Sequence, residues 1–174
     1  PPSWMILEVT SFGTLSNLYS NLLPGHNKRD IASYFGVDET TFQSWLHSFT
    51  YVRNVCAHHS RLWNKQMSIS PQVPLTPLHP FITITTIPNR NTNLPPILNN
   101  NKVYFLLSIL IYLLNTINPN HTFKQKLFNL LKKYPMIHLP AMGFPQGWES
   151  EEIWNWKDVK SSQKWFNKVL KYFR

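Results

Sequence analysis

Residues 38–64 read DETTFQSWLHSFTYVRNVCAHHSRLWN and carry a strong helical pattern. The first of them, Asp38, has a side chain suited to cap a helix N-terminus. Behind it, apolar side chains recur at the spacing of one helix face. They are Phe42, Trp45, Leu46, Phe49, Val52 and Cys56, with Trp63 continuing the line. The pattern predicts a long amphipathic helix that runs from Asp38 to about Trp63.

Similar patterns predict helices elsewhere in the chain. We expect them over residues 3–23, 29–35, 101–117, 123–134 and 161–173. Pro24-Gly25 and Gly36 supply stop signals for the first two. The most apolar run, 103–114, is shorter than the roughly 20 residues that cross a bilayer, so it predicts a buried core helix. These patterns indicate an all-α fold, with a helical bundle as its natural packing.

A proline-rich segment interrupts the helical patterns from about residue 66 to 100. Its seven prolines exclude a helix through most of it, and the alternating run 81–87 predicts a short strand or extended arm. We therefore expect an extended insertion within one helical domain over 1–156. The last segment, 157–174, is expected to form a basic amphipathic helix. This helix could dock on the bundle, bind RNA or bind an anionic membrane surface, and all three alternatives remain open.

The charge balance indicates polyanionic partners. A net charge of +9 and a pI near 9.8 suit nucleic acid or an acidic membrane surface. The single cysteine, Cys56, excludes an internal disulfide and favours a reducing, cytoplasmic setting. The chain has no signal-peptide pattern and starts without a methionine, so we expect that an upstream portion is missing.

Two charged residues occupy positions where the helical patterns call for apolar ones. Arg53 falls in the apolar sector of the 38–63 helix, and Glu8 falls among Trp4, Phe12 and Leu15 of the first helix. A charge buried without a partner costs several kcal/mol. We therefore expect the two helices to pack together, with Glu8 paired to Arg53. A purely structural ion pair and a functional one both remain open.

The other side of the long helix predicts a cationic polar face. Asn54, His58 and Arg61 are spaced i, i+4 and i+7, and His47 and Lys65 extend the line. Imidazoles beside guanidinium groups can hold a phosphate and move protons next to it. This combination indicates catalysis on RNA or contact with RNA.

The motif also resembles that of a known superfamily. Arg53-Asn-x-x-x-His58 is similar to the signature of the HEPN ribonucleases, and its context through Asn64 resembles the AbiD/AbiF-like abortive-infection proteins of bacteria. Three further segments carry the resemblance: Trp4-x-x-x-Glu8-x-x-x-Phe12-Gly13, residues 30–36, and Met142-Gly-Phe-Pro-x-x-Trp148. Together they cover most of residues 3–156.

The resemblance implies a HEPN-like bundle that dimerises across the motif helix and acts on RNA in antiphage defence. It also implies that a neutralising RNA or protein antitoxin could restrain such a protein. Attack by a ribose 2′-OH needs a base, an acid and cationic donors at the phosphate. One histidine cannot be base and acid at once, whereas two copies of His58 across a two-fold axis could be.

These considerations give each candidate residue a role in a metal-independent endoribonuclease without a cofactor. We expect His58 to act as general base or acid, Arg53 to clamp the phosphate, and Glu8 to hold Arg53. Asn54 would position His58 or the phosphate, and His59, Arg61 and Lys65 would contact RNA. A zinc site is disfavoured, because adjacent histidines point apart on a helix. An RNA-binding or sensor module without catalysis is the main alternative, and a membrane-associated protein is a third.

Overall fold

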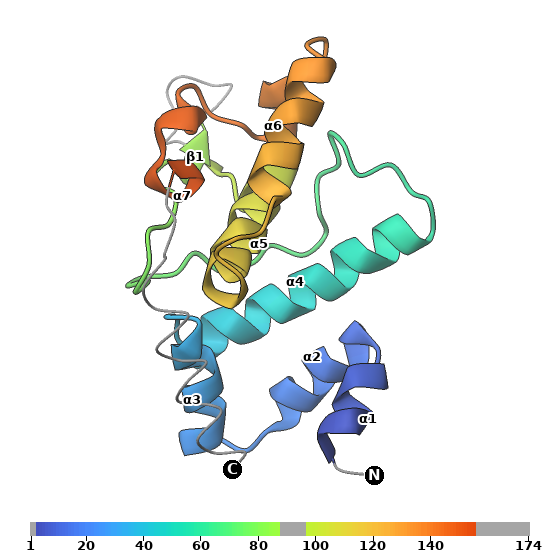
Figure 1. Ribbon diagram of the computed structural model, residues 1–174, viewed down its shortest axis with the longest axis vertical. Helices are drawn as coiled ribbons and strands as arrows, with labels where there is room; N and C mark the ends of the chain where they lie inside the picture. Colours follow the sequence, from blue (N-terminus) through green and yellow to red (C-terminus); the bar gives the residue numbers. More distant parts are fainter. Residues whose placement is uncertain (1–2, 88–96, 156–174) are drawn as a thin grey trace. The chain divides into compact units, whose positions relative to one another are not determined.

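The computed structural model describes residues 3–87 and 97–155 of the chain, which are mainly helical (Figure 1). The α-helices are α1 (Ser3–Val9), α2 (Phe12–Asn21), α3 (His26–Tyr34), α4 (Glu39–Ala57), α5 (Val103–Ile117), α6 (Phe123–Lys133) and α7 (Glu152–Asn155). Two 3-10 helices, η1 (Leu139–Met142) and η2 (Trp148–Ser150), and two short strands, β1 (Thr86–Ile87) and β2 (Ile97–Leu98), complete the described elements. The expected all-α class is confirmed, while the expected helix over 161–173 lies outside the described residues.

The chain divides into two compact units. The first comprises Pro1–Leu78 with Asn100–Val103, and the second comprises His79–Asn99 with Tyr104–Arg174. The division falls within the proline-rich segment: its beginning, through Leu78, and Asn100 at its end belong to the first unit, whereas the residues from His79 to Asn99 belong to the second. The single helical domain over 1–156 stays a prediction.

The first helical pattern folds as two helices, so the expectation of one continuous helix over 3–23 is wrong. Helix α1 ends at Val9, where the Thr10 hydroxyl donates to the carbonyl of Ile6. Ser11 has an extended backbone, and its Oγ accepts a hydrogen bond from the Thr14 amide at 3.2 Å. A serine with this geometry caps a new helix, because it satisfies an amide that has no partner within the helix.

Helix α4 begins as its sequence predicts. The Asp38 carboxylate accepts from the Thr41 amide at 2.8 Å and from the Thr41 hydroxyl at 2.6 Å. Phe42 and Trp45 of the apolar stripe are buried, whereas Leu46, Phe49 and Val52 are half-buried. The stripe therefore buries its N-terminal half most deeply.

Helices α2 and α3 supply the surface against which α4 packs in the first unit. Tyr19 of α2 meets Phe42 edge to face, with ring centroids 5.0 Å apart, and Phe35 stacks on Phe42 at 4.6 Å. Gly13 of α2 lies against α4, since a Cβ at this position would be 3.4 Å from Cγ2 of Thr50. Gly36 follows α3 with φ of 69°, which confirms it as the residue that closes this helix.

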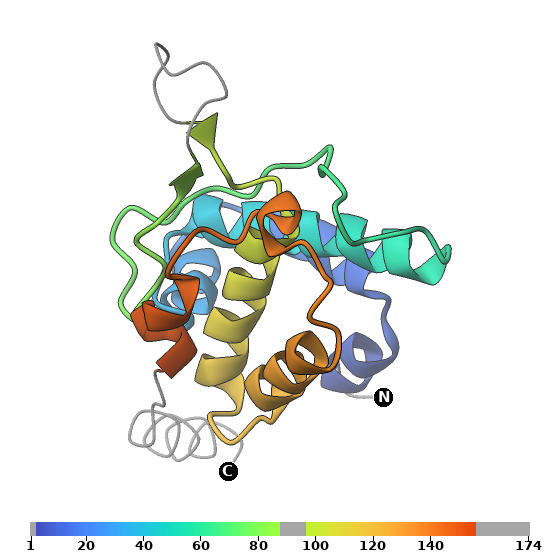
Figure 2. The ribbon, with the colours of Figure 1, turned by 90° about the horizontal axis from the view of Figure 1, so that it is seen from above.

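The second unit is built around the apolar helix α5. Its side chains at 104, 105, 109, 111 and 112 are at most 1% exposed, which confirms the prediction of a buried core helix. Figures 1 and 2 show α6 beside α5. Both helices contribute rings to a cluster that includes Trp148 and Trp154, with Tyr104 from α5 and Phe128 from α6. The burial of these rings therefore stabilises this unit.

The proline-rich segment contains no helix where it is described, and its strands are two residues long. Strand β1 pairs antiparallel with β2, with Thr86 opposite Leu98. The paired region is shorter than the predicted 81–87, because Thr83 and Ile84 bond to a side chain instead. The buried carboxylate of Glu151 accepts from the amides of Thr83 and Ile84, each at 2.8 Å.

Candidate functional site

The motif helix α4 ends at Ala57, six residues before the expected end at Trp63. The His59 amide donates to the carbonyl of Cys56 and the Ser60 amide to that of Val55, each at 3.0 Å. These two bonds form a Schellman motif, in which His59 adopts the left-handed conformation with φ of 52°. The predicted stripe of Asn54, His58, Arg61 and Lys65 along one helix face is therefore wrong. Arg61 and Lys65 lie on the loop that follows the helix.

Arg53 and Asn54 are joined by a side-chain hydrogen bond in the last turns of α4. Nη1 of Arg53 donates to Oδ1 of Asn54 at 2.9 Å. Both side chains are exposed, so the expected burial of Arg53 in the apolar sector is wrong. A guanidinium has five N–H donors, and this contact uses one of them. The bond orients the group and leaves other donors facing solvent.

The predicted ion pair between Glu8 and Arg53 is also wrong. Both side chains are exposed, and among the described residues the ion pair is Arg29 with Glu39 at 3.4 Å. Since Arg53 stays in water, its charge needs no buried carboxylate to offset desolvation. Within the described chain, Arg53 bonds to the neutral side chain of Asn54. Its exposed guanidinium is therefore accessible to an anion.

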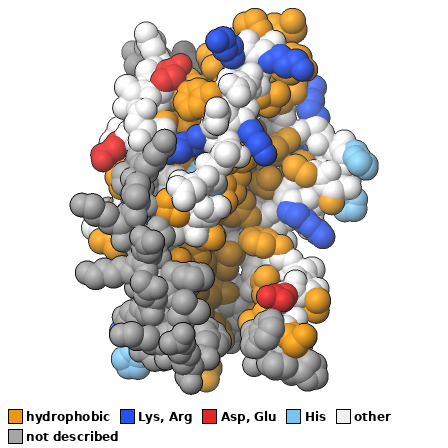
Figure 3. Space-filling view, viewed as in Figure 1, with side chains coloured by type: hydrophobic (Ala, Val, Ile, Leu, Met, Phe, Trp, Pro, Cys, Tyr) orange, Lys and Arg blue, Asp and Glu red, His pale blue; other side chains and the backbone are white. Residues whose placement is uncertain are grey.

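His58 stands at the C-cap of α4 with its side chain exposed. Its amide donates to the carbonyl of Asn54 at 3.0 Å, so Asn54 is bonded to His58 through its backbone and to Arg53 through its side chain. Figure 3 shows histidine side chains on the surface on the side where α4 ends. His58, His59 and Arg61 are all exposed there. The structure thus gathers imidazole and guanidinium groups at one helix end.

The loop after α4 brings a second polar group back to the helix. Tyr51 Oη and Ser68 Oγ lie 3.4 Å apart, within hydrogen-bond distance. The hydrogen bond with Ser68 lowers the pKa of Tyr51, and the positive charge of Lys65 adds to it against an opposing effect of burial. Lys65 therefore lies close to Tyr51. The sequence patterns missed Tyr51 and Ser68, because their pairing depends on the path of the loop.

Two other kinds of site are absent from the described residues. No group of three or more His, Cys, Asp or Glu side chains in residues 3–87 and 97–155 is arranged to hold a metal ion. No helix of the described ranges is both long and apolar enough to cross a membrane.

A comparison with known families identifies the part of the chain that carries this site. Residues 1–64 match the family model of Abi-like proteins. The match includes α1 to α4 and the whole motif through Asn64. No curated protein and no solved structure matches the chain. The match supports a relationship with an abortive-infection family.

Proposed function

We propose that the chain is an abortive-infection endoribonuclease of the HEPN type, which cleaves RNA without a metal ion. The observation that carries the proposal is the Arg53–Asn54–His58 arrangement at the exposed end of α4, inside the segment that matches the Abi-like family. The net charge of +9 suits a polyanionic substrate.

The proposed reaction uses groups that the structure leaves accessible. The ribose 2′-OH attacks the adjacent phosphorus while a base takes its proton. The bond from phosphorus to the 5′-oxygen then breaks, and an acid protonates that oxygen. Products are a 2′,3′-cyclic phosphate and a 5′-hydroxyl. His58 exchanges the protons, and Arg53 donates hydrogen bonds to the phosphoryl oxygens as negative charge develops on them. Asn54 is a positioning residue, since it holds the guanidinium.

A homodimer would supply the two proton-transfer groups that the reaction needs. In-line displacement places base and acid on opposite sides of the phosphorus, so a single imidazole cannot serve both at once. An isologous contact near the end of α4 would bring two copies of His58 to one phosphate. The exposure of this helix end leaves it open to such a contact. Activity in the cytoplasm and control by an antitoxin RNA or protein are part of the same proposal.

An RNA-binding module without catalysis is the second candidate. The exposed cationic groups of Arg53 and Arg61 and the half-buried Lys65 favour it, because they would bind an RNA backbone whether or not a bond is cut. Glu8, which forms no ion pair with Arg53 in the described part of the chain, is given no role in either candidate.

Purified protein incubated with total RNA in EDTA separates the two candidates. We expect cleavage by the wild type and loss of cleavage in His58→Ala, with unchanged helical content by circular dichroism. His26→Ala, which changes an exposed histidine of α3, is the matched control and should cleave like the wild type. Binding without cleavage by the wild type would overturn the enzymatic proposal and favour the binding module.

A further inference from the structure

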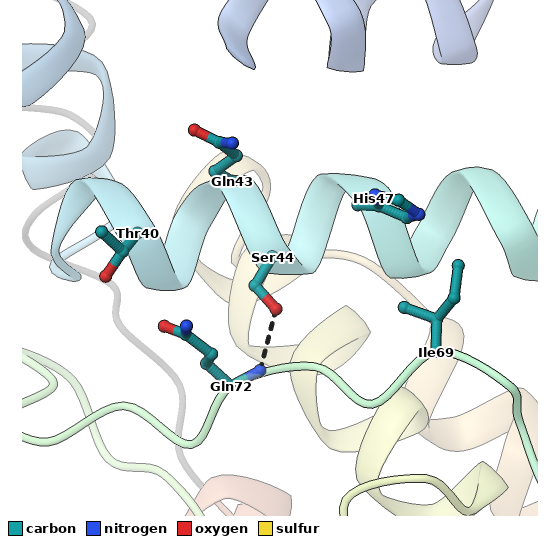
Figure 4. Close-up of a pocket in the computed structure, with 6 residues that line it drawn as sticks. All are labelled: Thr40, Gln43, Ser44, His47, Ile69 and Gln72. Atoms are coloured by element: carbon teal, nitrogen blue, oxygen red, sulfur yellow. Dashed lines mark hydrogen bonds between the residues drawn. The ribbon is translucent and has the colours of Figure 1, made fainter. Parts of the chain in front are cut away.

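A pocket lies between α4 and the loop that follows it (Figure 4). It has a volume of about 280 Å³ and is lined by Thr40, Gln43, Ser44, His47, Ile69 and Gln72. Ligand pockets generally measure roughly 300–1,000 Å³, so this one suits a small group. Figure 4 shows Thr40, Ser44 and His47 on the helix, with Ile69 and Gln72 on the facing loop.

The backbone of the loop is anchored at the pocket by two hydrogen bonds. The Gln72 amide donates to Oγ of Ser44 at 3.0 Å, and the Gln72 carbonyl accepts from Nε1 of the buried Trp45 at 2.9 Å. On the helix side, the half-buried Gln43 is held through Oε1, which accepts from Nζ of Lys28 at 3.0 Å. The pocket walls are therefore set by the fold before any ligand binds.

Two side chains in the pocket have no part in holding the fold. The ring of His47 and the side-chain amide of Gln72 are exposed, and neither has a hydrogen-bond partner among residues 3–87 and 97–155. They combine a flat ring with an amide that can donate and accept. No lysine, arginine, aspartate or glutamate lines the pocket. Its chemistry fits a planar, neutral, hydrogen-bonding group better than a phosphate.

The pocket lies on the same side of α4 as the candidate site. At about 100° per residue, Ser44, His47, Tyr51, Asn54 and His58 fall within one sector of the helix. His58 lies eleven positions after His47, which corresponds to about 16 Å along the axis. A few nucleotides of an unstacked single strand could span this distance, passing Tyr51 and the nearby Lys65.

We propose that this pocket binds one unpaired nucleobase of RNA, at a position a few nucleotides from the bond that His58 cleaves. The inference rests on the proposed ribonuclease function and adds a base preference to it. The imidazole of His47 stacks on the base, and the Gln72 amide bonds to its polar edge, as aromatic and amide side chains do with single-stranded RNA. Arg53 and Arg61 would contact the phosphates outside the pocket.

Binding of uncharged nucleosides tests the pocket without any need for cleavage. Adenosine, cytidine, guanosine and uridine are each titrated into full-length protein labelled with ¹⁵N, and inorganic phosphate is titrated separately. We expect at least one nucleoside to shift the His47 ring and Gln72 side-chain signals, and phosphate to leave them unchanged. Shifts with phosphate alone, or with no probe, would overturn the proposal.

Oligonucleotide binding then links the pocket to RNA. In the His58→Ala background, short RNA strands of a single base type are compared by fluorescence anisotropy. The His47→Ala/Gln72→Ala variant should bind the preferred strand about fivefold or more weakly, and the base preference should disappear. The His26→Ala variant should keep both. An unchanged base preference in the double variant would contradict base binding by the pocket but not the ribonuclease function. Absent cleavage by the wild type would contradict the ribonuclease function but not base binding by the pocket.

Discussion

The amide of Ser60 donates to the carbonyl of Val55 at 3.0 Å, and this bond closes the motif helix. It ends α4 at Ala57 and places His59 in the left-handed region, with φ of 52°. As a result, His58 stands at an exposed helix end instead of on a continuous helical face. The presentation of the candidate catalytic imidazole thus depends on a Schellman turn that lacks the usual glycine.

Replacement of His59 should show the cost of this turn. A left-handed conformation costs a residue with a Cβ about 1 kcal/mol, and glycine avoids most of that cost. We expect His59→Gly to raise the free energy of unfolding by up to about 1 kcal/mol and His59→Ala to give no such gain. Urea denaturation followed by circular dichroism measures both variants. Destabilisation by the glycine variant would mean that the His59 side chain itself stabilises the turn. RNA binding by the same variants tests the predicted contact of His59.

The start of the same helix should depend on Asp38. Burial alone would raise the pKa of this carboxyl, but hydrogen bonds from Thr40 and Thr41 outweigh it and lower the pKa. Because the folded pKa lies below the unfolded value, the cap stabilises the fold above a pH of about 4 and is lost as the pH falls further. We expect Asp38→Ala to cost about 1 kcal/mol in the free energy of unfolding at neutral pH. Asp30→Ala, at an exposed position of α3, is the control and should change little.

His121 should make the second unit sensitive to mild acid. Nδ1 accepts from the Phe123 amide at 3.1 Å, and Nε2 lies 2.9 Å from Oδ1 of Asn115, so the ring serves α6 in its neutral form. Burial lowers the pKa of His121, and the charge of Lys124 adds to this effect. Since the folded pKa lies below the unfolded one, stability is present above a pH of about 6.5 and falls as the pH drops below it.

Substitution of this histidine isolates its contribution. Thermal unfolding from neutral pH to about pH 5 should show a smaller loss of stability for His121→Asn than for the wild type. His26→Asn should keep the wild-type slope, since the His26 side chain is exposed and α3 begins without a side-chain cap hydrogen bond. Equal slopes for the wild type and His121→Asn would exclude His121 as the titrating group.

Glu151 should be needed for the extended segment of the second unit. Its side chain accepts hydrogen bonds from both amides at residues 83 and 84 and from the Thr83 hydroxyl. Hydrogen bonds to a charged group are worth about 1.5–3 kcal/mol, so we expect Glu151→Ala to destabilise by about 2 kcal/mol. Glu149→Ala, at an exposed neighbour, should be nearly neutral. Hydrogen exchange at Thr83 and Ile84 that is unchanged in Glu151→Ala would contradict this role.

Local chemical signals account for the parts of the fold that could be predicted. The Asp38 carboxylate can cap the start of a helix, and Gly36 can adopt the positive φ that closes one. The apolar run of α5 can be accommodated only in a core. The break between α1 and α2 was missed, although Ser11 carries a capping signal. Apolar periodicity continued across it and favoured one helix.

The geometry of the candidate site was harder to predict. The Arg53-Asn-x-x-x-His58 spacing identified residues that do lie at one helix end, but no glycine or proline marks the stop at Ala57. Helical periodicity therefore predicted that Arg61 and Lys65 share a helix face with Asn54 and His58, whereas both lie on the loop after α4. The Glu8–Arg53 pair failed for another reason. Sequence pattern alone could not show that Arg53 stays exposed and bonds to its neighbour Asn54.

The chemistry of the cut RNA ends tests the central claim most directly. RNA is incubated with wild type, His58→Ala or His26→Ala in EDTA, and the new 3′ ends are examined by mass spectrometry. Attack by the 2′-OH, with His58 exchanging the protons, predicts 2′,3′-cyclic phosphates with the wild type and His26→Ala and none with His58→Ala. New ends that carry a 3′-hydroxyl, or cyclic phosphates formed equally by His58→Ala, would contradict it.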